Sequence, residues 1–163
     1  EYGRTSSPAV YAAGDAAGPP YLANRGIAQA LTAVRSSLDG GSLPYRHDWV
    51  VEAVYTEPQI AQVGLQEKHA AENGTAYEIR GGEYHQALKG RLSGHSPGFL
   101  KILISPADGT ILGAAAVGAG AAEILASLAV AVRAGMTIDE FAGVFPAHPT
   151  MAELPFILAR DHR

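Results

Sequence analysis

The dipeptide Asp108-Gly109 constrains the fold of this chain more than any other local feature. It separates two runs of residues that are typical of strands, 98–105 and 110–117. Asp-Gly is a preferred pair for a tight turn between antiparallel strands, because glycine readily adopts the left-handed backbone conformation that such turns require. The sequence therefore predicts that the two runs form a hairpin, and that at least part of the sheet is antiparallel.

Further strand patterns precede this hairpin. Residues 49–55, 60–64 and 76–84 are rich in apolar and β-branched side chains and are bounded by turn residues. Between the second and third of these runs, residues 65–73 predict a short helix that ends at Asn73-Gly74. About five strands are therefore expected before residue 118.

Helix patterns follow the hairpin. Residues 121–134 are rich in alanine, carry apolar side chains on one face, and end at Gly135. The segments 137–140 and 150–153 both match the capping box that opens a helix. Strands followed by helices predict an α+β fold, an antiparallel β-sheet of about five strands with helices packed on one face. The small side chains of residues 121–134 allow close approach, so we expect this helix to contribute both to the core and to a subunit contact.

A separate strand and helix come first in the chain. Residues 9–13 predict a buried strand that stops at Gly14-Asp15, and residues 22–38 predict a helix with an apolar face that closes at Asp39-Gly40-Gly41. The stretch 40–44 is the best candidate for a linker.

Composition excludes several classes of function. The 163 residues carry a net charge of −4 and no cluster of lysine or arginine, which argues against nucleic acid as a partner. No apolar run is long enough to span a membrane, and no signal-peptide pattern opens the chain, so a cytoplasmic location is expected. The chain begins at Glu1 rather than at methionine, which suggests a fragment or a processed protein.

The absence of cysteine excludes disulfides and thiolate metal sites within this chain. Histidines other than His148 show no metal-ligand spacing with one another or with carboxylates, so no metal site is predicted.

The strongest chemical signal is the stretch 147–153, in which His148 precedes a proline and Glu153 follows five residues later. An imidazole with a carboxylate partner is a plausible general base. No cysteine or other nucleophile stands beside it, so the stretch predicts half of an active site. Two other interpretations remain open: His148 stabilises a turn, and Glu153 serves only the capping box of Thr150.

Five segments in order resemble the C-terminal third of the flavin-dependent pyridine nucleotide-disulfide oxidoreductases, the family of dihydrolipoamide dehydrogenase, glutathione reductase and mercuric reductase. The resemblance covers essentially the whole chain. The segments are Pro8-Ala9-Val10-Tyr11-Ala12-Ala13-Gly14-Asp15, Tyr55-Thr56-Glu57-Pro58-Gln59-Ile60-Ala61-Gln62-Val63-Gly64, Gly98-Phe99-Leu100-Lys101-Ile102, Ile111-Leu112-Gly113-Ala114 and His148-Pro149-Thr150 with Glu153.

This resemblance implies a domain organisation and a cofactor. Residues 1–44 are expected to be the last strand and helix of an FAD domain, and residues 45–163 to be the dimerisation domain. Gly14 and Asp15 match the second flavin-binding signature, in which the aspartate binds a ribityl hydroxyl of FAD. Leu22 and Ala23 stand where the family directs a helix N-terminus at the flavin ring, a favourable site for developing negative charge.

The resemblance also implies a mechanism. His148 and Glu153 match the base and carboxylate that serve the redox dithiol of the opposite subunit in a homodimer, where the parent enzyme uses NAD(P)H to reduce a small disulfide substrate. The Gly-rich flavin loop, the paired cysteines and the nicotinamide domain are absent from this chain. We therefore expect the fragment to be inactive and to retain neither FAD nor NAD(P)H without the remainder of the parent.

Two aspects of this assignment stay open. Pro146 stands where many lipoamide dehydrogenases carry a second histidine, and Phe145-Pro146 is closer to the mercuric reductase version, so the sub-family is not determined. The alternatives are a purely structural homodimerisation module, a mercuric reductase-like or other flavoprotein reductase, and a free-standing small enzyme that uses His148 with a bound cofactor.

Overall fold

A computed structural model describes residues 2–39, 43–94 and 97–161 of the chain. The chain divides into two compact units, Glu1–Val50 and Val51–Arg163. The predicted linker 40–44 lies largely outside the described residues, and the predicted domain boundary between residues 44 and 45 stays a prediction. Each unit is described by itself below.

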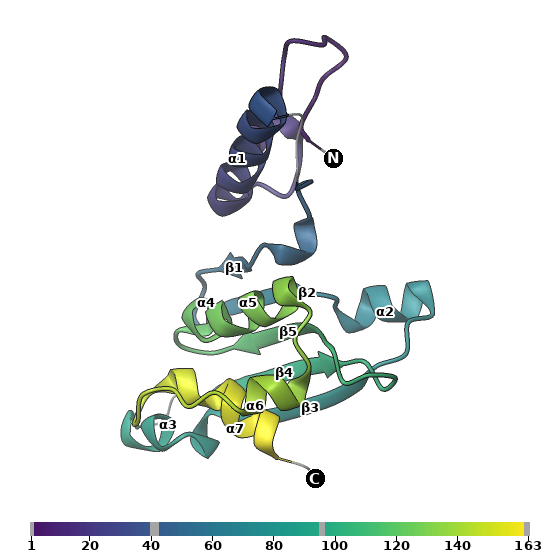
Figure 1. The fold of residues 1–163 in the computed structure, drawn as a ribbon. Coiled ribbons are helices and arrows are strands. Elements are labelled where there is room, and N and C mark those ends of the chain that lie inside the picture. The colour runs from purple at the N-terminus through teal and green to yellow at the C-terminus, as the bar shows by residue number, and fades with distance from the viewer. Residues whose placement is uncertain (1, 40–42, 95–96, 162–163) are drawn as a thin grey trace. The chain divides into compact units, whose positions relative to one another are not determined.

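The second unit is built on one five-stranded sheet (Figure 1). Its strands are β1 (Glu52–Val54), β2 (Ile60–Gly64), β3 (Glu78–Glu83), β4 (Phe99–Ile104) and β5 (Ile111–Val117). Their order across the sheet is β1-β2-β5-β4-β3, and every neighbouring pair is antiparallel. The predicted antiparallel α+β fold is confirmed.

The β4–β5 hairpin forms at the predicted dipeptide. Gly109 has a φ of 74°, which favours glycine, and its N–H donates to the Ser105 carbonyl at 2.9 Å. The Asp108 carboxylate accepts from the Thr110 N–H at 3.1 Å. Three hydrogen bonds, from the Ser105 side chain and from the backbone and side chain of Thr110, hold the pKa of Asp108 below its ordinary value.

One face of the sheet forms the core. Alternate residues of the central strands point to this face and are buried, and α4 (Ala121–Ile124), α5 (Ala126–Ala134) and α7 (Leu154–Arg160) cover it. Helices α4 and α5 contact β2 and β5, whereas α7 contacts β3 and β4. The buried residues of β2, β4 and β5 on this face include Ala61, Val63, Leu100, Ile102, Ala114 and Ala116. The alanines of β5 leave room for α5 to approach closely.

The predicted helix over 121–134 forms in two parts. Helices α4 and α5 meet at Leu125, whose φ and ψ are −77° and −9°, and Gly135 ends α5 in the left-handed conformation. No glycine or proline marks the break in the sequence. Leu125 is fully buried, so we attribute the break to packing in the core.

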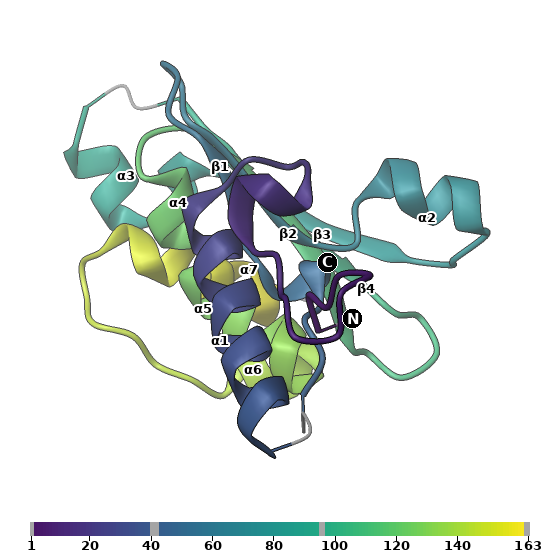
Figure 2. The same cartoon turned by 90° about the horizontal axis from the view of Figure 1, so that it is seen from above.

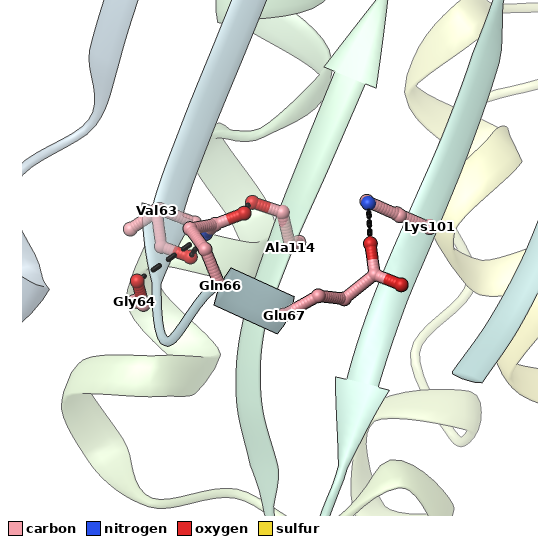
Figure 3. Close-up of polar contacts among 6 residues, drawn as sticks. All are labelled: Val63, Gly64, Gln66, Glu67, Lys101 and Ala114. Carbon is pink, nitrogen blue, oxygen red and sulfur yellow. Dashed lines mark hydrogen bonds and ion pairs between the residues drawn. The ribbon is translucent and has the colours of Figure 1, made fainter. Parts of the chain in front are cut away.

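The start of helix α2 (Glu67–Asn73) is attached to the face of the sheet opposite the core. Lys101 alternates with the buried residues of β4 and pairs with Glu67 (Figure 3). The side-chain amide of Gln66 donates to the carbonyls of Val63, Gly64 and Ala114, at 3.0 to 3.2 Å. These contacts attach the start of α2 to β2 and β5.

Among its described residues, the second unit has two further short helices. Figures 1 and 2 show α2 and α3 (Leu88–Leu92) at opposite ends of the sheet. Helix α6 (Ile138–Ala142) begins with the predicted capping box, in which the Glu140 N–H donates to the Thr137 hydroxyl at 3.2 Å and the Thr137 N–H donates to the Glu140 carboxylate at 2.8 Å. Short 3-10 turns cover Tyr84–Gln86 and Met151–Glu153 in this unit, and His47–Trp49 at the end of the first unit.

The first unit contains α1 (Ala23–Asp39) and a 3-10 turn, Gly14–Ala17. Residues 9–13 do not form the predicted buried strand: one bridge joins Tyr11 to Arg4, and Val10 is 51% exposed. A strand requires hydrogen-bonded neighbours, and among the described residues of this unit only residues 3–5 lie alongside.

The predicted helix over 22–38 is confirmed as α1, but its apolar stripe faces outward. Ile27, Leu31, Val34 and Leu38 are all more than half exposed. The buried side is polar: the Gln29 side chain accepts from the Gly14 N–H at 2.8 Å. No helix of the described residues is long and apolar enough to cross a membrane.

Candidate functional site

His148 and Glu153 lie together, as their spacing predicts. The segment 143–150, which has no regular secondary structure, carries the histidine, and the 3-10 turn Met151–Glu153 carries the glutamate. His148 Nδ1 lies 2.8 Å from Glu153 Oε1. The peptide bond between His148 and Pro149 is cis.

Glu153 performs both of the tasks that the sequence left open. While Oε1 binds His148, Oε2 accepts from the Thr150 N–H at 2.8 Å. These bonds are possible together because a carboxylate offers two oxygens with several lone pairs. The capping interaction therefore does not compete with the histidine contact.

Electrostatics determines which nitrogen of His148 carries the proton. The pKa of Glu153 lies below its ordinary value, first because Thr150 donates a backbone hydrogen bond and then because His148 donates a side-chain one. An ionised carboxylate only accepts hydrogen bonds, so Nδ1 must be the donor. In the neutral ring Nε2 then has a free lone pair. The His148 side chain is 61% exposed, which leaves it accessible to a reactant.

The predicted cofactor residues lie in the first unit, around the beginning of α1. Gly14 has a φ of 65° and packs closely on α1, since a Cβ placed on Gly26 would lie 3.2 Å from the Gly14 Cα. Asp15 is exposed in the 3-10 turn, Leu22 directly precedes α1, and Ala23 is exposed in its first turn. An exposed carboxylate near the beginning of a helix fits a ligand with hydroxyls and a ring that accepts hydrogen bonds.

Sequence reasoning missed one residue near His148. Arg160, in the last turn of α7, donates from Nε to the Ala142 carbonyl at 2.9 Å and lies over the Phe145 ring, with Cζ 4.4 Å from its centroid. The available signal was its spacing: Arg160 follows Glu153 by two helical turns, which places both on one side of the final helix. Within residues 2–39, 43–94 and 97–161, no cluster of three or more acidic or histidine side chains could hold a metal ion.

Comparisons with known proteins agree on one family. Residues 50–156 match the family described as pyridine nucleotide-disulphide oxidoreductase, dimerisation domain. Glutathione reductase of Burkholderia cepacia is 35% identical, over 100% of this chain and 36% of that protein. Dihydrolipoyl dehydrogenase of Chlorobaculum tepidum is 32% identical, over 92% of this chain and 32% of that protein. The chain thus spans about a third of the length of these relatives.

Solved structures give the same result. LpdA of Mycobacterium tuberculosis has a TM-score of 0.91 and 28% identity, over 98% of this chain and 35% of that one. The HOCl-induced flavoprotein disulfide reductase RclA of Escherichia coli shares the fold, with a TM-score of 0.85 and 21% identity over 99% of this chain and 38% of that one.

Proposed function

We propose a function that proceeds from one premise: this chain belongs to the pyridine nucleotide-disulphide oxidoreductases, and its residues 50–156 are a dimerisation domain of that family. The proposal is that the chain is the C-terminal part of a homodimeric NAD(P)H:disulfide oxidoreductase of the glutathione reductase and dihydrolipoyl dehydrogenase type. The overall reaction transfers two electrons from NAD(P)H, together with protons, to a small disulfide, which becomes two thiols. The observation that carries the proposal is the hydrogen bond between His148 and Glu153.

His148 is the general base of this reaction. Its Nε2 accepts the proton of a thiol and leaves a thiolate, the reactive form of sulfur. Glu153 keeps the Nδ1 proton in place and stabilises the imidazolium that forms. This chain has no cysteine, so the dithiol belongs to sequence outside it, and in the dimer to the partner subunit.

Gly14, Asp15, Leu22 and Ala23 contribute to the flavin site of the parent. Asp15 accepts a hydrogen bond from a ribityl hydroxyl, and the first turn of α1 presents N–H groups to the ring. The bound flavin supplies the two-electron chemistry that links nicotinamide and dithiol. The fragment by itself binds neither cofactor and is inactive, because most of both binding sites lies in the remainder of the parent.

Two exposed surfaces support the proposed partners. The apolar stripe of α1 (Ile27, Leu31, Val34 and Leu38) is a face that the remainder of the flavin domain covers. In the second unit, Val130 of α5 is 65% exposed between the exposed alanines Ala126 and Ala134. Such a small apolar helix face suits close contact with a second copy of the chain.

Subunit complementation tests the proposal in the full-length enzyme that contains this chain. One subunit carries His148→Ala, and the other carries serine in place of both redox cysteines. The homodimer without redox cysteines should be inactive, and the His148→Ala homodimer should retain only a small residual rate. After subunit exchange, half of the dimers are mixed and each has one complete site, so activity should return to about a quarter of the wild-type value.

The outcomes separate the proposal from its alternatives. If mixing restores nothing although mixed dimers form, His148 does not act across the subunit interface. If His148→Ala leaves turnover unchanged, the domain is a purely structural dimerisation module in which Glu153 only caps a helix. Flavin content and dimer mass serve as controls, because His148→Ala should change neither.

A further inference from the structure

The segment that carries His148 is held at both of its ends by the final helix and the turn before it. Residues 143–150 have no helix or strand of their own. At the C-terminal end, Glu153 binds both His148 and the Thr150 N–H, each at 2.8 Å. The N-terminal end is held by Arg160.

Arg160 makes three contacts with the start of this segment. Its Nε donates to the Ala142 carbonyl at 2.9 Å, and a terminal nitrogen of the guanidinium donates to the Val144 carbonyl. The guanidinium also lies over the Phe145 ring, with Cζ 4.4 Å from the centroid. Phe145 is 81% exposed, so this contact is one of few that restrain its ring.

The chemistry of these contacts suits arginine in particular. Ala142 is the last residue of α6, where carbonyl groups lack partners within the helix. The planar guanidinium offers several donors in a fixed geometry, so it can bind two carbonyls and stack on a ring at the same time. Lysine has a single point of charge and cannot make all three contacts together.

We propose that Arg160 is a positioning residue for the His148 base: by joining Ala142, Val144 and Phe145 to the end of α7, it fixes the path of the segment that presents His148 to the dithiol of the partner subunit. This inference rests on the proposed function, because it assigns Arg160 an effect only through His148. A small displacement of a base reduces the rate sharply, since proton transfer requires hydrogen-bond distance.

A double-mutant cycle in the full-length holoenzyme tests the inference. The variants are R160Q, R160K, His148→Ala and the combination of R160Q with His148→Ala. R160Q should lower kcat for disulfide turnover by roughly tenfold to a hundredfold with little change in KM, and R160K should fall in between. In the His148→Ala background, R160Q should have almost no further effect, because the base that it positions is already absent.

A matched control removes another arginine that also donates to a backbone carbonyl. Arg91, on α3, donates to the His85 carbonyl at 3.4 Å rather than to the segment of His148. R91Q should leave kcat unchanged. Should R160Q fail to bind flavin or to dimerise, R160K carries the test instead.

Two outcomes would contradict the role of Arg160 and leave the proposed function intact. One is wild-type kcat in R160Q, and the other is an equal loss in the presence and absence of His148. If instead His148→Ala has wild-type turnover, the proposed function fails, and the inference fails with it.

Discussion

The stacked rings of Phe141 and Phe156 provide the sharpest test of how the site is supported. Phe141 lies on α6 and Phe156 on α7, and the segment of His148 runs between these helices. The ring centroids are 4.2 Å apart and the planes differ by 10°. Both rings are buried, 3% and 5% exposed. Replacing either ring by leucine keeps most of the apolar volume and removes the stack.

The expected cost follows from these two contributions. A near-isosteric exchange in a packed core costs up to about 1.5 kcal/mol, and an aromatic pair contributes about 0.5–1.5 kcal/mol beyond its buried area. F141L and F156L should therefore each lower the free energy of unfolding by about 0.5–3 kcal/mol. Because the stack can be lost only once, the double variant should cost about 0.5–1.5 kcal/mol less than the sum of the singles.

Urea unfolding followed by NMR measures these quantities, with amide signals of β4 and β5 as probes of the second unit. The control is Val63→Ala on β2, which removes a buried side chain from a strand contacted by α4 and α5. Its cost should add to that of F141L within about 0.5 kcal/mol. A double variant whose cost equals the sum of its singles would refute the reasoning, since the rings would then stabilise α6 and α7 independently.

The remaining predictions concern Glu153 and Tyr84. In E153Q the side-chain amide has one oxygen and cannot accept from both Thr150 and His148. We expect this oxygen to keep the helix cap and the NH₂ group to donate to His148 Nδ1, so that ring ¹⁵N shifts show the proton on Nε2. A ring still protonated on Nδ1 would contradict this prediction. Because the folded-state pKa of Glu153 is lowered, its stabilising effect is complete above the ordinary value of 4.5 and is lost as pH falls through the folded pKa. The difference in urea midpoint between wild type and E153Q should therefore shrink on acidification. Among the described residues, the hydroxyl of Tyr84 is buried without a hydrogen-bond partner, and burial raises the pKa of Tyr84 to about 12. Y84F should thus leave the free energy of unfolding unchanged or raise it by about 1 kcal/mol, and a clear loss of stability would show that the hydroxyl is satisfied.

Local features of the fold were predictable from sequence because their causes lie within a few residues. The strand over 60–64 forms as β2 with the same bounds. Gly74 and Gly135 end their helices in the left-handed conformation, and Thr137 opens α6 with the expected capping box. In each case a backbone preference or a contact three residues away decides the outcome.

In the candidate site, too, the local contact was predictable from the sequence and the long-range contact was not. Glu153 is five residues from His148, so the sequence indicated the pair directly, and the structure adds that one oxygen serves each task. Arg160 was not predictable as a partner of Ala142 and Val144, because that contact exists only when α6 and α7 pack together.

The sequence by itself determined the hairpin, the helix ends, the resemblance to a family and the pairing of His148 with Glu153. Only the tertiary structure decided the order β1-β2-β5-β4-β3, the ion pair that joins Glu67 of α2 to Lys101 of β4, and the absence of a strand over 9–13. Turns and caps depend on the backbone energies of adjacent residues, whereas strand pairing and burial depend on neighbours distant in sequence. Residues 9–13 and the exposed stripe of α1 show the consequence: apolar patterns specify a buried face, but a partner elsewhere must be present to bury it.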